Sequence, residues 1–68
     1  MLRSRIKAYI ELSPLTREEI MIKMNVSNNT ISSWCTGKSR PSLEDTFKLS
    51  RLLSVTVEDL YEYVEEDE

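Results

Sequence analysis

The sequence predicts an all-α fold in which five short helices form one compact bundle. Apolar residues recur at helical spacing, and a hydroxyl residue able to cap a helix stands before most of these periodic segments. No segment alternates between apolar and polar residues as a half-buried strand would, and no internal repeat is present. With 68 residues, the chain is expected to form a single domain over residues 1–64, followed by an acidic C-terminal tail at residues 65–68.

The first predicted helix is amphipathic and begins near the N-terminus. Its apolar stripe recurs at i, i+4, i+7 and i+8 and comprises Leu2, Ile6, Tyr9 and Ile10. The helix must end before Pro14, because the residue ahead of a proline disfavours the right-handed helical conformation.

The second and third predicted helices are joined by a tight turn. Thr16 opens the second helix with a capping box, in which its hydroxyl accepts the backbone N–H of Glu19 and the Glu19 carboxylate reaches back. Asn25 is placed at the turn, since Asn tolerates the left-handed conformation better than any residue except Gly. Ser27 caps the third helix, and Gly37, the only glycine, ends it. Helices joined so tightly cross steeply, and the second can project into a major groove.

The fourth and fifth predicted helices carry the same capping signal. Ser42 and Thr56 each stand before a periodic segment, and each is followed three residues later by an aspartate. The fifth helix is expected to have a modest apolar face formed by Leu60, Tyr61 and Val64.

The charges are distributed unevenly along the chain. The net charge of −3 argues against a nucleic-acid partner if it is taken for the chain as a whole. Residues 1–53 hold all nine bases and only five acids, a net charge of +4, whereas residues 54–68 hold seven acids and no base. A basic body with an acidic end is compatible with DNA on one face.

Several function classes lack the residues that they need. With no histidine and one cysteine, the chain has no zinc ligand set and no Ser–His or Cys–His pair, so we expect no metal, no cofactor, no catalytic residue and no enzyme activity. The longest apolar run covers residues 20–22, so no membrane span is expected. Cys35 alone cannot form an internal disulfide, which fits a reducing cytoplasm.

Over residues 2–60 the chain resembles the phage repressor and Cro-type helix-turn-helix family, also called Xre-like. The resemblance depends on the order of a capped helix followed by Val26-Ser27, Thr30-Ile31-Ser32-Ser33-Trp34, Gly37-Lys38 and Arg40-Pro41-Ser42-Leu43. It implies a lambda-repressor-like five-helix domain that binds double-stranded DNA, usually as a dimer on a palindromic operator. The chain departs from the family at Asn25, where Gly is usual, and at Cys35-Thr36, where Glu-Asn is frequent.

The resemblance also implies which residues contact DNA. Base contacts match the outward residues early in the third helix, namely Asn28, Asn29, Ser32 and Ser33. Phosphate contacts match the start of the second helix, the cap of the third and the loop after it, namely Thr16, Arg17, Ser27, Lys38, Ser39 and Arg40. An Asn amide can pair with adenine N6 and N7. The alternatives are that the two asparagines only favour a helix start and that the bases are ordinary solvated charges.

Two apolar features are interpreted as packing surfaces. Trp34 lies three residues after Ile31 on the inward side of the third helix, so we expect it in the core rather than as a stacking platform. The end of the bundle contains more apolar residues than its own packing requires, so a two-fold contact between copies of the chain is expected there. The residues predicted for this contact are Leu52, Val55, Leu60, Tyr61 and Val64. Part of this set could instead close the small core.

These observations favour a cytoplasmic transcriptional regulator, a repressor that reads a palindromic operator as a homodimer through the helix starting at Ser27. If the protein responds to a signal, we expect the signal to arrive as a protein regulator or as the chain's own concentration through dimerisation. The alternative is a protein-interaction module, such as an antitoxin or antirepressor partner, which keeps the fold with weak or no specific DNA binding. The overall acidity and the uncharged outward face of the third helix support that alternative.

Overall fold

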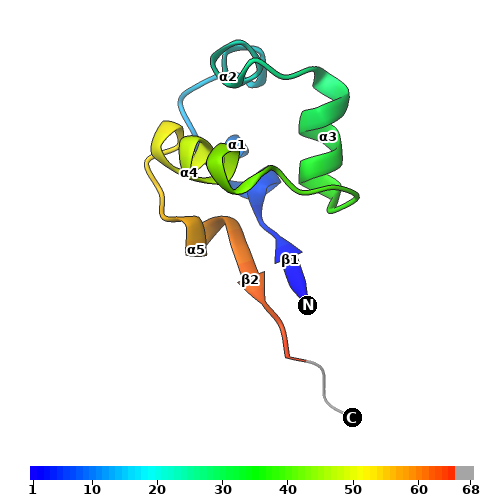
Figure 1. Ribbon diagram of the computed structural model, residues 1–68. Helices are drawn as coiled ribbons and strands as arrows, with labels where there is room; N and C mark the ends of the chain where they lie inside the picture. The colour runs from blue at the N-terminus through cyan, green and yellow to red at the C-terminus, as the bar shows by residue number, and fades with distance from the viewer. Residues whose placement is uncertain (66–68) are drawn as a thin grey trace.

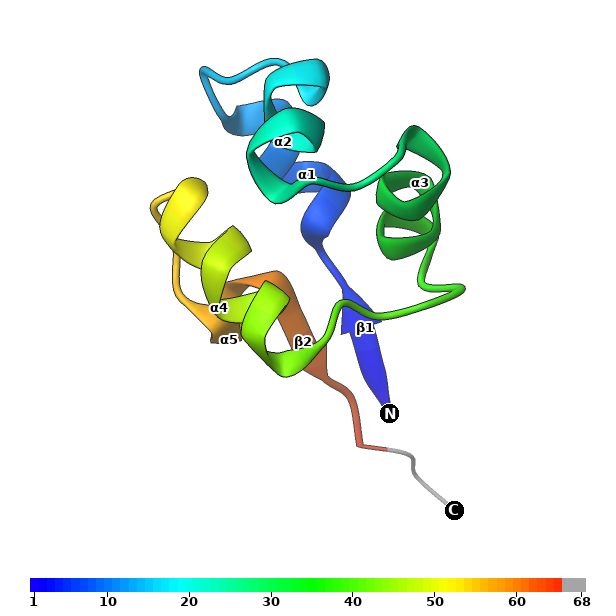
Figure 2. The same ribbon diagram turned by 45° about the horizontal axis from the view of Figure 1, so that its top comes forward.

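Helices pack around a single apolar core, and a short two-stranded ribbon joins the two ends of the chain (Figure 1). The computed structural model describes residues 1–65, so most of the predicted acidic tail lies outside the described residues. Within those residues the elements in chain order are β1 (Leu2–Ser4), α1 (Ile6–Leu12), α2 (Arg17–Met24), α3 (Asn28–Thr36), α4 (Leu43–Leu52), α5 (Val57–Leu60) and β2 (Tyr61–Tyr63). In both ribbon views α3 and α4 lie on opposite sides of α1 (Figure 2).

The ribbon corrects the prediction of an all-α fold. Strand β1 pairs with β2 in antiparallel register, with Leu2 opposite Tyr63 and Ser4 opposite Tyr61. The first helix therefore begins at Ile6 and not near residue 2. The spacing of apolar residues could not reveal strand β1, because an i, i+4 pair is compatible both with one helix and with a strand followed by a helix. The strand that pairs with β1 lies about sixty residues away in the sequence.

The fifth helix is shorter than the sequence analysis predicted. It spans one turn, and Tyr61 already has an extended backbone with φ −136° and ψ 135°. The Leu60 carbonyl accepts the Arg5 backbone N–H at 2.8 Å, and this bond joins the end of the helix to the start of the ribbon. The prediction that Tyr61 and Val64 continue a helical face was wrong, since in a strand Tyr61 and Tyr63 lie on one side and Glu62 on the other.

The predicted caps and the predicted turn are confirmed. Thr16 and Glu19 form the full capping box, with N···O distances of 3.1 and 2.9 Å. Asn25 adopts the left-handed conformation with φ 57° and ψ 49°, and Gly37 does so with φ 82°. The Ser27 hydroxyl accepts the Thr30 backbone N–H at 3.2 Å. Local hydrogen bonding therefore sets where α2 ends and where α3 begins.

The last two helices have the predicted caps as well. The Ser42 hydroxyl accepts the Asp45 backbone N–H at 3.1 Å at the start of α4. Thr56 and Asp59 form a second full capping box at the start of α5.

The two capping boxes make stability depend on pH. Hydrogen bonds from the backbone and hydroxyl of Thr16 hold the pKa of the Glu19 carboxyl below its ordinary value, and Thr56 does the same for the pKa of Asp59. The folded state therefore binds protons at these two carboxylates less tightly than the unfolded chain does. The resulting stabilisation of the fold is present at pH values above the unfolded-state pKa values, and it is lost as the pH falls through the lowered folded-state pKa values. We expect the free energy of unfolding from urea titrations to decline below about pH 4.5.

A variant that removes both titrating groups provides the comparison for this pH dependence. Glu19→Gln/Asp59→Asn keeps an acceptor oxygen at each position but cannot ionise, so its stability should change less over the same acidic range. Equal pH slopes for this variant and the wild type would contradict the assignment.

The core is formed by apolar residues from α1 to α5. Its buried members are Ile6, Ile10, Ile20, Met24, Ile31, Trp34, Leu49, Leu53 and Leu60. The prediction that Trp34 belongs to the core is confirmed. The Ser4 hydroxyl donates to the Trp34 carbonyl at 2.7 Å, so the ribbon is fastened directly to α3.

Candidate nucleic-acid interface

The predicted base-reading residues form one outward face on α3. Ile31 and Trp34 are buried on the inner side of this helix, which turns the other side toward solvent. Asn28 and Asn29 are exposed, and Ser32 and Ser33 are half-buried. We call the face formed by Asn28, Asn29, Ser32 and Ser33 the reading face. Its polar side chains are short, so close approach or bridging water would be needed for them to contact a base edge.

Arg17 connects the start of α2 to the reading face. Its Nε donates to Asn28 Oδ1 at 3.0 Å, and its Nη2 donates to Ser32 Oγ at 2.6 Å. The sequence analysis assigned Arg17 to phosphate and the other two residues to bases, and it did not foresee that their side chains would meet. Only an acceptor atom can face the Nε–H group, so this bond fixes which end of the Asn28 amide points away from Arg17.

A shallow hollow lies beside the reading face. It is lined by Asn29, Ser32, Ser33, Thr36 and Lys38. Thr36 was not among the predicted site residues, although it lies three and four positions after the two serines and so shares their side of the helix. Its hydroxyl donates to the Ser32 carbonyl at 3.1 Å, which leaves its methyl group free to contact an apolar atom in the hollow.

Some of the residues predicted to contact phosphates already form hydrogen bonds within the protein, and others are exposed to solvent. The Thr16 and Ser27 hydroxyls both serve as caps for their own helices. Lys38, Ser39 and Arg40 are exposed in the loop after α3, where the Ser39 backbone N–H donates to the Ser33 carbonyl at 3.3 Å. The loop is therefore held against the end of the reading helix, with two basic side chains facing solvent.

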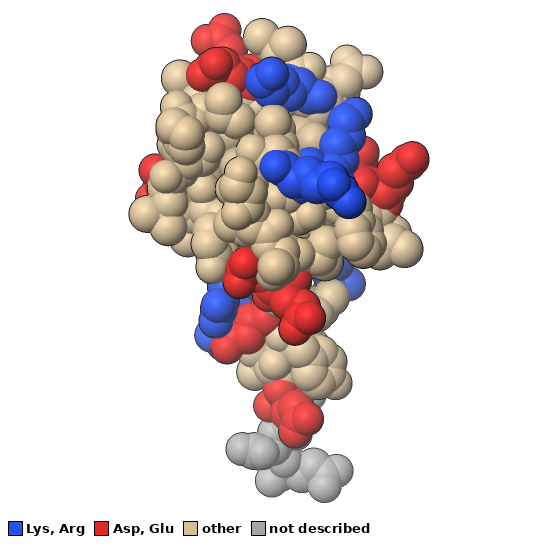
Figure 3. All heavy atoms as spheres, turned by 90° about the vertical axis from the view of Figure 1, so that its left-hand side faces the viewer, with Lys and Arg blue, Asp and Glu red and all other residues tan. Residues whose placement is uncertain are grey.

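The side of the bundle away from α3 carries charges of both signs. Seen from the left-hand side of Figure 1, basic and acidic side chains are interspersed, and the lower end, where β2 lies, is mostly acidic (Figure 3). That side lacks the continuous basic surface that DNA binding usually requires. The acidic end predicted from the sequence therefore coincides with the ribbon end of the molecule.

The residues predicted for the two-fold contact are mostly committed to this chain's own packing. Leu60 has no exposed surface, so including it in a contact between copies was wrong. Leu52, Val55 and Tyr61 are half-buried and pack against the core. The backbone N–H of Val64 donates to the Met1 carbonyl at 2.7 Å, beyond the end of the ribbon. The structure exposes other large apolar side chains, among them Leu2, Leu43 and Tyr63.

Cys35 lies near the end of α3, half-buried against the core. Burial raises the pKa of its thiol, which keeps the sulfur protonated and of low reactivity. Within residues 1–65, no three or more His, Cys, Asp or Glu side chains gather where they could hold a metal ion. In the same part of the chain, no helix has both the length and the apolar character that crossing a membrane requires.

Comparison with known proteins agrees with the arrangement of α2, the Asn25 turn and α3. The helix-turn-helix family model matches residues 6–60. The chain belongs to the Xre-like helix-turn-helix family. An uncharacterized HTH-type transcriptional regulator of Methanocaldococcus jannaschii is 37% identical over 67 residues, which cover 98% of this chain and 100% of that protein. Two uncharacterized HTH-type transcriptional regulators of Archaeoglobus fulgidus are each 32% identical over 66 residues, covering 97% of this chain and 93% and 94% of theirs.

The family model covers the helices and does not extend over the ribbon. The matched residues 6–60 begin with the first residue of α1 and finish with the last residue of α5. Both strands of the ribbon lie outside this range. The helix-turn-helix fold, DNA binding and regulation of transcription are thus the family's properties. The alignments with the three relatives cover 97% or 98% of this chain and so extend beyond the family model into both ribbon strands.

Proposed function

We propose that this helix-turn-helix protein represses transcription by binding a palindromic operator as a dimer, with α3 in the major groove. The observation that carries the proposal is the network in which Arg17 holds Asn28 and Ser32 across the outward face of α3. The Arg17–Asn28 bond is exposed to solvent and the Arg17–Ser32 bond is partly buried, so the network lies at the surface and not in the core. A reading helix gains preorganised side chains, which reduce the ordering cost of binding.

The network also supports a division of labour between the two asparagines. With its Oδ1 engaged by Arg17, Asn28 can offer its Nδ2–H₂ group to an acceptor such as guanine O6 or N7 or thymine O4. Asn29 has no such partner among the described residues and can present both amide atoms, as pairing with adenine requires. Arg17 uses two of its five N–H groups here and keeps the others for a phosphate or a base.

The proposed repression requires no contact beyond operator binding. A protein that occupies an operator overlapping a promoter blocks the polymerase without a second contact. The rival proposal is a protein-interaction module, and Glu18 and Glu19 in the first turn of α2 favour it, because acids beside a predicted phosphate site oppose DNA. The following experiment separates the two proposals.

Sequences should be selected from a random double-stranded DNA pool at moderate salt. The wild type is expected to enrich a two-fold symmetric consensus whose half-sites lie about 10 base pairs apart, centre to centre, or a multiple of that. Asn28→Ala/Asn29→Ala should lose discrimination at two positions in each half-site, by about 1–3 kcal/mol at each position.

Lys48→Ala is the control for this selection, because it removes an exposed charge on α4 and leaves the reading face intact. It should enrich the same consensus as the wild type. No enrichment by the wild type would contradict DNA reading and support the protein-interaction module.

A further inference from the structure

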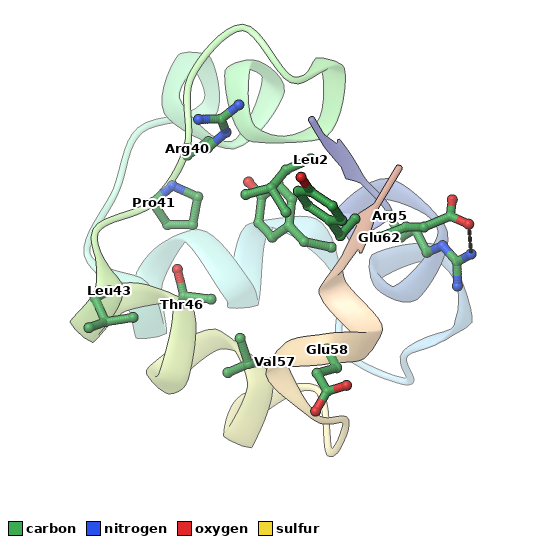
Figure 4. Close-up of a pocket in the computed structure, with 11 residues that line it drawn as sticks. Leu2, Arg5, Arg40, Pro41, Leu43, Thr46, Val57, Glu58 and Glu62 are labelled. Carbon is green, nitrogen blue, oxygen red and sulfur yellow. Dashed lines mark ion pairs between the residues drawn. The ribbon is translucent and has the colours of Figure 1, made fainter. Parts of the chain in front are cut away.

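An open apolar groove lies between the ribbon and the starts of α4 and α5 (Figure 4). It encloses about 570 Å³, and pockets that hold small molecules measure roughly 300–1,000 Å³. Leu2 and Tyr63 from the ribbon, Leu43 from α4 and Val57 from α5 provide its apolar lining. We call this feature the ribbon groove. None of the residues that line it belongs to the reading face.

The apolar lining of the ribbon groove is open to solvent. Leu43 is 74% exposed, Tyr63 68% and Leu2 40%. Leu2 lies opposite Tyr63 in the ribbon, so both side chains point to the same face and form one wall of the groove. Contiguous apolar surface of this kind usually marks a contact with another molecule.

The Tyr61 hydroxyl is a polar atom of the groove lining that lacks a partner. It is buried and has no hydrogen bond within residues 1–65. Ser4 lies opposite Tyr61 in the ribbon. The Ser4 hydroxyl already donates to the Trp34 carbonyl and accepts the Ile6 backbone N–H at 3.3 Å. Buried polar atoms almost always have a hydrogen-bond partner, so the Tyr61 hydroxyl calls for one from outside the chain.

Arg40 lines the same groove and acts on the Tyr61 phenol. Burial raises the pKa of this phenol, while the Ser4 hydroxyl and the Arg40 charge act in the opposite direction. The phenol therefore keeps its proton at neutral pH and can donate it. Arg40 forms no ion pair within residues 1–65. A neutral donor and an unpaired guanidinium in one groove together favour a negatively charged acceptor, such as a carboxylate or a phosphate.

Two acids in the lining decide between a carboxylate and a phosphate. Glu58 lies at the end of the groove opposite Arg40 (Figure 4), and Glu62 lines the groove as well. Their charges oppose a dianionic phosphate more strongly than a single carboxylate. Because Glu58 repels an acid, the carboxylate is directed to the Arg40 end, and the rest of the ligand lies along the apolar lining.

We propose that the ribbon groove binds a small-molecule carboxylic acid with an apolar body, of the size of a medium-chain fatty acid. The carboxylate accepts hydrogen bonds from the Arg40 guanidinium and the Tyr61 hydroxyl. The apolar body covers Leu2, Leu43 and Val57. This assignment gives the domain a ligand site that is separate from the reading face and requires neither DNA nor a second chain.

Arg40 connects this site to the proposed function, because it is also a predicted phosphate contact. A carboxylate bound to Arg40 neutralises the charge that would meet the phosphate. The ligand should therefore weaken operator binding and reduce its salt slope by about one. This consequence rests on the proposed function, whereas the ligand site itself does not. An operator affinity that is the same with and without the ligand would contradict the connection.

Octanoate tests the site on the full chain without DNA. On titration into the ¹⁵N-labelled protein, octanoate should shift the backbone amide resonances of residues that line the groove, among them Leu2, Leu43 and Tyr61, and not those of the reading face. Octan-1-ol has the same alkyl chain without the charge, so it should bind at least about tenfold more weakly.

Substitutions in the polar end of the groove test the two contacts separately. Arg40→Gln should weaken octanoate binding at least about tenfold and leave the affinity for octan-1-ol unchanged. Tyr61→Phe keeps the ring and removes only the hydroxyl, so it should weaken octanoate binding at least about threefold. Lys48→Gln makes the same change of charge at an exposed position of α4 outside the groove, and it should bind octanoate as the wild type does. Circular dichroism of each variant confirms that it is folded.

The outcomes distinguish this inference from the proposed function. Equal affinities for octanoate and octan-1-ol, or an Arg40→Gln variant that binds octanoate as tightly as the wild type, would overturn the inference. Groove resonances that shift with protein concentration and not with octanoate would also overturn it, because a second copy would then cover the groove. If octanoate binds as expected and the wild type enriches no DNA, the ligand site stands and the proposed function fails. If a DNA consensus is enriched and octanoate does not bind, only the ligand site is wrong.

Discussion

Arg17→Ala is expected to weaken binding to the selected operator by about 1–3 kcal/mol, which corresponds to roughly 5- to 150-fold in Kd. The variant loses a positive charge proposed to lie near the DNA backbone, and it loses the two hydrogen bonds that hold the Asn28 and Ser32 side chains in place. The measurement is a fluorescence anisotropy titration on the wild-type consensus and on a scrambled duplex. Specific binding should fall more than binding to the scrambled duplex.

Arg17→Lys separates the two causes of that loss. Lysine keeps the charge but lacks the planar fork that reaches both side chains at once. If Arg17 orients the reading face, Lys will retain non-specific affinity and lose discrimination at the position read by Asn28. If Arg17 serves only as a phosphate contact, Lys will behave as the wild type, and Arg17→Ala will lower affinity for both duplexes equally and reduce the salt slope by about one.

Trp34→Ala is expected to have the largest effect on stability, a loss of about 3–5 kcal/mol. Trp34 is buried among the core residues, so truncating its side chain leaves a large cavity. A domain of this size has a total stability of only several kcal/mol, since native proteins lie at about 5–15 kcal/mol. A large unfolded fraction at 25 °C is therefore expected.

The measurement for Trp34→Ala is urea unfolding followed by far-ultraviolet circular dichroism. Leu12→Ala is the control, because Leu12 is 77% exposed and its truncation should change the free energy of unfolding by less than about 0.5 kcal/mol. Similar losses for the two variants would show that the core does not depend on the tryptophan.

The features that the sequence predicted correctly are set by neighbours along the chain. The capping boxes at Thr16 and Thr56 need only a residue three positions on, and the turn at Asn25 needs only a residue that tolerates positive φ. The burial of Trp34 follows from its spacing to Ile31 within one helix. Such signals act over one or two turns and can be read directly from the order of residues.

The features that the sequence did not predict depend on residues far apart in the chain. Leu2 becomes part of a strand because Tyr63 lies beside it, and the Arg5 bond to Leu60 links two segments that no periodicity connects. The same reason explains the reading face, where Arg17 and Asn28 were each identified as site residues without their contact being foreseen. Whether these residues bind DNA in the assigned roles stays a prediction.

The pairing of β1 with β2 has a consequence for the order of events during synthesis. The Met1 ammonium donates to the Val64 carbonyl at 2.8 Å, so bonds between the two ends close a loop that spans nearly the whole chain. Closing so long a loop costs entropy, and β2 leaves the ribosome after all five helices. During synthesis α1 to α4 can pack together before β2 has been made, and until then β1 has no strand with which to pair. The ribbon can therefore form only after residues 61–63 have emerged, later than the helices.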